Sequence, residues 1–131
     1  MDPDKKQKLL ELVDSVADLR KAQKRLSDER QELQSKQHII WSRVTLEVAQ
    51  ALDNSGKRIY SNDHMRDAAR NIRLIEHSEY QERAERIREL NQRIDNGHIE
   101  LARLEDQRRI LAADAGIDPY FGGDGYLGGR W

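Results

Sequence analysis

The first half of the chain repeats apolar side chains at seven-residue intervals. One series consists of Leu12, Leu19, Leu26, Leu33 and Ile40; a second consists of Leu9, Val16, Gln23, Arg30, Gln37, Val44 and Ala51. Side chains with this spacing share one stripe of an α-helix and correspond to the d and a positions of a coiled coil. Asp2 followed by Pro3 is typical of a helix start, and no glycine or further proline interrupts the pattern. We therefore predict a helix over about 3–52.

The second series becomes polar in its middle, at Gln23, Arg30 and Gln37. Polar a positions lower stability but fix the register and the number of partner helices; alternatively, this stretch simply faces solvent. Beyond it the apolar face widens, which indicates that more than one helix packs there. Because a two-helix seam buries little surface, we expect a homodimer. The residues assigned to self-association are Ile40, Trp41, Val44 and Val48.

The middle of the chain contains a turn and a short helix. Residues 53–56, Asp-Asn-Ser-Gly, are typical of a helix end. Residues 57–60 are expected to be extended, and residues 61–63 offer N-cap side chains for a helix over 63–76. The apolar face of that helix consists of Met65, Ala68, Ala69, Ile72 and Ile75. The opposite side carries Arg66, Arg70 and Arg73, with Lys57 and Arg58 nearby.

These basic residues support two interpretations. Guanidinium groups can bind phosphate oxygens in a bidentate manner. The candidate phosphate contacts are Lys57, Arg58, Arg66, Arg70 and Arg73. Alternatively, the arginines form a solvated face and pair with Asp63, Asp67 and Glu76. Tyr60 beside them is either a stacking residue or part of the packing at the hinge.

The C-terminal part repeats the heptad pattern. Ser78 and Gln81 match a capping box, which predicts a helix over about 78–115. Its two series are Tyr80, Ile87, Ile94 and Leu101, and Leu90, Gly97, Leu104 and Leu111. A glycine within a helix costs about 1 kcal/mol relative to alanine, so Gly97 marks either a close helix approach or a local irregularity. The whole pattern predicts an all-α fold, a long antiparallel helical hairpin (coiled coil) that forms one domain over 1–115.

Residues 116–131 differ in composition from the rest of the chain. They contain six of the eight glycines, and we expect them to form a flexible tail. They also contain four of the seven aromatic residues, namely Tyr120, Phe121, Tyr126 and Trp131. Two interpretations stay open. The aromatic residues dock into a groove of a partner protein and become ordered on binding, or the tail folds back and covers an apolar stripe of its own chain.

The composition excludes several kinds of chemistry. There is no cysteine, which rules out disulfides, thiolate metal sites and a cysteine nucleophile. The four histidines lie in different segments without metal-binding spacing, and no phosphate-binding glycine motif is present. We therefore expect no enzymatic activity, no metal and no cofactor. Lysine and arginine nearly balance the acidic residues, and no apolar run reaches membrane-spanning length, so we expect a cytoplasmic protein without a membrane partner.

One segment resembles a known group of proteins. Residues 57–62, Lys-Arg-Ile-Tyr-Ser-Asn, are followed by Arg66, by Glu79-Tyr80-Gln81 and by a long heptad arm. This pattern, over about 56–112, resembles small coiled-coil accessory proteins of phages and mobile elements. The resemblance implies a partner-binding role and no catalytic residues. We accordingly expect a non-enzymatic interaction or assembly adaptor that self-associates and docks a protein partner through its tail; the alternative is a nucleic-acid-binding accessory protein.

Overall fold

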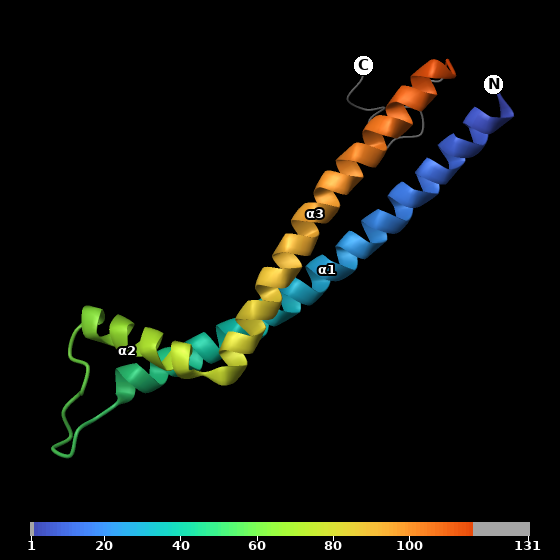
Figure 1. The fold of residues 1–131 in the computed structure, drawn as a ribbon. Coiled ribbons are helices and arrows are strands. Elements are labelled where there is room, and N and C mark those ends of the chain that lie inside the picture. Colours follow the sequence, from blue (N-terminus) through green and yellow to red (C-terminus); the bar gives the residue numbers. More distant parts are fainter. Residues whose placement is uncertain (1, 117–131) are drawn as a thin grey trace, which may run out of the picture. The chain divides into compact units, whose positions relative to one another are not determined.

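The computed structural model describes residues 2–116 and contains three helices (Figure 1). They are α1 (Pro3–Gln50), α2 (Asp63–Glu76) and α3 (Ser78–Asp114). Apart from one isolated bridge between Leu52 and Arg58, the described residues contain no β-structure. The prediction of an all-α chain is confirmed for this range. The glycine-rich and aromatic tail beyond residue 116 lies outside the described residues.

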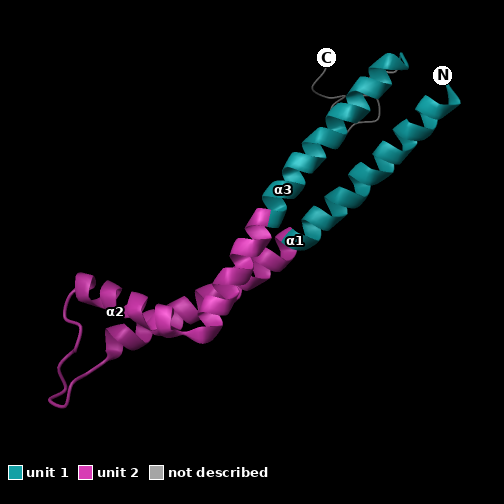
Figure 2. Cartoon of the chain, viewed as in Figure 1, with its two compact units in different colours: residues 1–26, 93–131 teal, residues 27–92 magenta. Residues whose placement is uncertain are grey.

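The described chain divides into two compact units where the sequence pattern predicted one domain (Figure 2). Unit 1 combines α1 up to Leu26 with α3 from Arg93 onward. Unit 2 comprises residues 27–92: the rest of α1, all of α2 and the start of α3. Both α1 and α3 therefore contribute a segment to each unit.

Two of the three helix starts use the cap that the sequence indicates. The Asp2 carboxylate accepts a hydrogen bond from the amide of Asp4 (3.0 Å), and Asn62 Oδ1 accepts one from the amide of Met65 (2.9 Å). Such bonds satisfy amides that have no partner within the first helical turn. Both helices thus begin where a short polar side chain precedes the apolar pattern.

The expected capping box at the start of α3 is wrong. His77, in an extended conformation between α2 and α3, caps the helix, and its Nδ1 accepts a hydrogen bond from the amide of Tyr80 (3.1 Å). The side chain of Gln81 turns the other way and donates to the carbonyl of Leu74 at the end of α2 (2.8 Å). Because a single residue separates the two helices, one side chain caps α3 while another satisfies the end of α2. Ser78 is the first residue of α3.

In unit 1 the seam between α1 and α3 is built from buried apolar residues and one buried amide. Val16 and Ile94 are buried, as is Gln23. Gln23 Nε2 donates a hydrogen bond to the carbonyl of Ile94 (2.8 Å). Gly97 makes room for this side chain, since a Cβ at position 97 would lie 2.0 Å from Gln23 Oε1. Of the two explanations for Gly97, the close approach is the one found.

Within unit 2, α1 and α3 pack through other polar pairs. Leu90 is fully buried. Gln37 Nε2 donates to the carbonyl of Tyr80 (2.7 Å), and Arg30 Nη1 donates to Asn91 Oδ1 (3.0 Å). The polar residues of the second series thus face α3 in their respective units and not open solvent.

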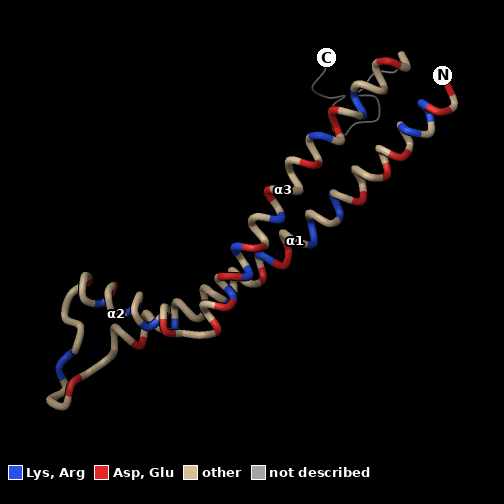
Figure 3. Tube along the Cα trace, in the orientation of Figure 1, with Lys and Arg blue, Asp and Glu red and all other residues tan. Residues whose placement is uncertain are grey.

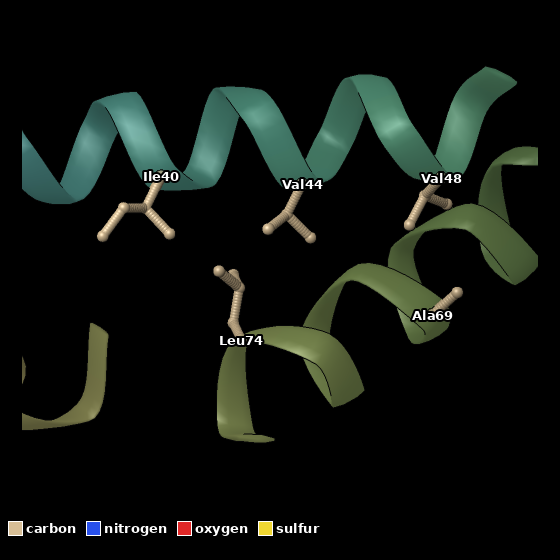
Figure 4. Close-up of a cluster of buried hydrophobic side chains, with 5 residues drawn as sticks. All are labelled: Ile40, Val44, Val48, Ala69 and Leu74. Atoms are coloured by element: carbon tan, nitrogen blue, oxygen red, sulfur yellow. The ribbon is translucent and has the colours of Figure 1, made fainter. Parts of the chain in front are cut away.

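α2 packs on the last turns of α1 within unit 2 (Figure 4). Their shared core consists of Ile40, Val44 and Val48 from α1 and Ala69 and Leu74 from α2. In Figure 4 the three α1 side chains point toward α2, and Leu74 points back toward them. Tyr60 and Tyr80 pack against this cluster and are partly buried. Burying these aliphatic side chains provides the hydrophobic stabilisation that holds α2 in place.

Candidate protein-interaction surface

Three of the four residues that the sequence assigns to self-association are buried within the chain. Ile40, Val44 and Val48 lie under α2. Trp41 lies beside them, keeps 36% of its surface exposed, and stacks on His38 with ring centroids 6.1 Å apart. The widening apolar face of α1 thus has a partner in α2 of the same chain. Contact with a second chain through Ile40, Val44 and Val48 would require α2 to move away.

α2 directs arginines toward α1. The Arg70 guanidinium lies over the Trp41 ring, 4.9 Å from its centroid, which is a cation–π contact. Arg73 Nη1 lies 3.8 Å from Glu47 Oε2 of α1. The aliphatic stems of such arginines cover apolar surface while their charged ends find partners. This side of α2 is therefore occupied by contacts within the chain.

Acidic neighbours on α2 complete the pairing of its arginines. Arg66 bonds Asp63 and also donates to the backbone carbonyl of Tyr60 (3.2 Å). Arg70 Nη1 lies 3.2 Å from Asp67 Oδ1. The pairing expected with Asp63 and Asp67 is present. These arginines are partly buried, and each of them lies in an ion pair.

The apolar face of α2 is exposed. Met65, Ala68, Ile72 and Ile75 all lie on the surface, and Ile72 and Ile75 keep 57% and 70% of their area exposed. A hollow of about 460 Å³ runs along this face, with Tyr60 among the residues that line it. Of the five residues predicted for the apolar face, Ala69 alone is buried. Four apolar side chains on one helix side with no partner in the unit form a candidate docking surface.

Charged residues of both signs flank this face. Lys57 and Arg58 belong to the loop before α2, which carries a basic segment in Figure 3. Glu76, at the other end, is the last residue of α2 and is exposed. The side chains of Lys57 and Arg58 form no ion pair within residues 2–116. The first turn of α2 itself carries Asp63, and its last turn carries Arg73 beside Glu76, so both ends of the helix hold charges of both signs once the preceding loop is included.

The loop that presents Lys57 and Arg58 is organised by Asp53. Asp53 Oδ1 accepts hydrogen bonds from the amide and hydroxyl of Ser55 (2.9 and 2.8 Å) and from the amide of Lys57 (3.0 Å). These donors, the Ser55 hydroxyl first, lower the pKa of the Asp53 carboxyl below its ordinary value. Gly56 occupies the left-handed region (φ +82°), which glycine adopts without strain. The ionised carboxylate thus fixes the conformation of the loop.

Other predicted features fall outside this surface. The aromatic residues of the tail, Tyr120, Phe121, Tyr126 and Trp131, lie outside the described residues. Within residues 2–116 no group of three or more histidine, aspartate or glutamate side chains is arranged to hold a metal ion. None of the three helices combines the length and the apolar character that crossing a membrane requires.

Sequence reasoning identified the residues of α2 but not which of them face outward. An amphipathic helix normally turns its apolar stripe toward the core. Here Ala69 and Leu74 pack into the core, and Arg70 and Arg73 on the same side of α2 contact Trp41 and Glu47, so the stripe faces outward. The sequence contained Trp41 and Glu47 as possible partners of these arginines, but no local pattern linked them to α2.

Comparison with known proteins adds no family assignment. No family model, no curated protein and no solved structure matches the chain.

Proposed function

We propose that this chain is a non-enzymatic protein-interaction module that self-associates through the exposed face of α2. The observation that carries the proposal is the orientation of that helix. Its arginines are occupied by α1 and by neighbouring acids, whereas Met65, Ile72 and Ile75 remain in water. Burying such an apolar side chain lowers the free energy by about 25 cal/mol for each Å² of apolar surface removed from water.

A second copy of α2, running antiparallel, suits this face. Symmetric dimers bring the same patch of both chains together. In the antiparallel arrangement, Glu76 at the end of one helix approaches Lys57 and Arg58 before the start of the other. The two helix dipoles also run in opposite directions. This arrangement is favourable because the positive start of each helix lies near the negative end of the other. The apolar stripes of the two copies then cover each other.

The size of the face predicts a weak dimer. Stable interfaces between proteins bury about 1,200 Å² or more in total, and four side chains on one short helix fall at or below that limit. We therefore expect a dimer that dissociates on dilution rather than a permanent one. Added salt should weaken its association only modestly, because salt screens the flanking charges but not the apolar contacts.

The test is sedimentation equilibrium across a range of protein concentrations. Ile75→Glu places a charge on the proposed interface and should reduce association at least tenfold. Ile99→Glu is the matched control, since Ile99 on α3 is 69% exposed against 70% for Ile75. The proposal fails if the unsubstituted chain is monomeric at every concentration, or if both substitutions weaken association equally. Circular dichroism of each variant verifies that the helices are retained.

The nucleic-acid alternative has less support. With Arg66, Arg70 and Arg73 engaged in ion pairs, only Lys57 and Arg58 of the candidate contacts have no partner within residues 2–116. Two cations release few counterions, so any phosphate-driven binding would be weak and would fall steeply with salt. An electrophoretic shift with duplex DNA or RNA at low salt would revive this alternative.

Two further parts of the proposal concern the arms and the setting. An antiparallel coiled coil is supported in unit 1 by the pairing of Lys5 with Asp114 and in unit 2 by that of Glu29 with Arg86. As numbers rise along α1, partner numbers fall along α3 within each unit. An adaptor role with a protein partner, a cytoplasmic location and the link to phages and mobile elements stay predictions.

A further inference from the structure

Unit 1 contains an apolar groove that is separate from the α2 surface. It has a volume of about 610 Å³ and lies between α1 and α3. Leu12 of α1 and Ile110 and Leu111 of α3 provide its apolar walls, and Ser15 lies at its rim. Ile110 keeps 71% of its surface exposed. A groove of this size lies within the range of pockets that hold small ligands, so it has room for aromatic side chains.

The groove extends to the point where α3 ends. Asp114, the last residue of α3, lines it and also bonds Lys5 of α1, which raises the pKa of the Lys5 ammonium above its usual value. Gly116 then adopts the left-handed conformation (φ +75°) and its amide bonds the carbonyl of Ala113 (3.0 Å). This geometry ends a helix and turns the chain away from the helix axis. The segment that follows therefore starts beside the groove.

We propose that the chain's own segment 117–131 occupies this groove, with Tyr120 and Phe121 as its aromatic anchors. Phe121 lies five positions after Gly116, and an extended chain spans at most about 3.3–3.6 Å per residue, or about 17 Å. The α3 residues that line the groove span about 10 Å of helix. Both anchors therefore reach every part of it without strain.

Tethering and the position of the chain end favour this occupant over a separate protein. The segment begins at residue 117, directly after the helix end that lines the groove. A tethered segment also has a high effective concentration, in the millimolar range for short flexible linkers, which an external ligand must overcome. This proposal involves a different unit and different residues from the α2 dimer, so either can fail alone.

Paramagnetic broadening in the full chain tests the proposal. Because the protein has no cysteine, Ser15→Cys accepts a single nitroxide label at the groove. The amide signals of residues near Tyr120 and Phe121 should disappear when the label is active and return when it is reduced. The same label at Ser42→Cys, on the exposed surface of unit 2, should leave them unchanged. Persistence of those signals with the label at position 15 would overturn the proposal.

Two additional measurements separate the occupants. In a mixture of isotope-labelled chains without nitroxide and unlabelled chains with it, broadening would show that the segment enters a second copy, which contradicts docking in its own chain. Ile110→Glu should restore the lost signals, whereas Ile99→Glu, with nearly the same exposure, should not. Equal effects of the two substitutions would also contradict the proposal.

Discussion

Gly97 admits the buried amide of Gln23 to the seam of unit 1. The glycine lacks the Cβ that would overlap Gln23 Oε1. The Gln23 side chain, which donates a hydrogen bond to the carbonyl of Ile94, occupies that space. The helix loses about 1 kcal/mol of propensity at a glycine, which the buried hydrogen bond offsets with about 0.5–1.5 kcal/mol. A glycine on one helix and a polar residue on the other are therefore a matched pair.

This pairing predicts that substitutions at the two positions are not additive. Gly97→Ala alone should change the free energy of unfolding little, because the gain in helix propensity is offset by displacement of Gln23. In the Gln23→Ala background the same substitution should be more favourable by about 1 kcal/mol. A double-mutant cycle in urea measures the difference. Arg30→Ala in place of Gln23→Ala is the control, and additivity in both cycles would refute the pairing.

The hydrogen bonds within the loop predict how the Asp53 carboxyl titrates with pH. Its folded-state pKa is lowered, so its stabilisation of the loop is present above the ordinary value of 3.8 and is lost as pH falls through the lower folded-state value. The amide shifts of Ser55 and Lys57, followed by NMR, should titrate with a midpoint below 3.8. In Ser55→Ala the largest cause of the shift is absent, and the Asp53 midpoint should move upward. An unchanged midpoint would show that the hydroxyl contributes nothing.

The junction between α2 and α3 shows how two helices share a single linking residue. The sequence offers Ser78 and Gln81 as a capping box, but only His77 lies outside both helices. An N-cap residue needs an extended backbone, which His77 has (φ −84°, ψ 105°), whereas Ser78 is already helical. The position of the junction thus decides which side chain acts as the cap.

The cap assignment makes opposite predictions for neighbouring residues. His77→Ala removes the acceptor of the Tyr80 amide and should lower the free energy of unfolding by about 1 kcal/mol. Ser78→Ala should change it by less than about 0.5 kcal/mol, as for ordinary surface positions. Thermal unfolding followed by circular dichroism compares the two, and His77→Asn should recover most of the loss. A larger effect at Ser78 would restore the capping box.

At the scale of the whole molecule, two compact units share the same two long helices. Unit 2 holds the α1–α2 cluster and the fully buried Leu90, while unit 1 holds the seam around Gln23 and the groove. Regions with separate clusters of buried contacts open as separate cooperative units. We therefore expect the two units to open separately, although α1 and α3 run through both.

Leu90→Ala tests this division. Removing a fully buried leucine side chain should cost about 2–5 kcal/mol, and Leu46→Ala, at an exposed position, should cost less than about 0.5 kcal/mol. Hydrogen exchange should show a greater loss of protection for amides in 27–92 than for those in 2–26 and 93–116. An equal loss throughout would mean that the described chain unfolds as one unit.

The sequence by itself determined the helices and their seam. Every residue of the two heptad series in 3–52 is at least partly buried, because the seven-residue period places these side chains on one stripe regardless of what covers it. The sequence likewise predicted Asp2 and Asn62 as N-caps, because an N-cap bonds an amide only a few positions further along the chain.

Tertiary structure alone decided how α2 is rotated and which residues remain free for a partner. The apolar stripe of α2 is clear in the sequence, but its direction depends on contacts with α1, which is distant along the chain. Ala69 and Leu74 pack on the end of α1, and the arginines on that side contact Trp41 and Glu47. The groove beside Leu111 also depends on tertiary structure. It forms where α1 and α3, which are distant in sequence, lie side by side in unit 1, and a local sequence pattern does not predict its shape.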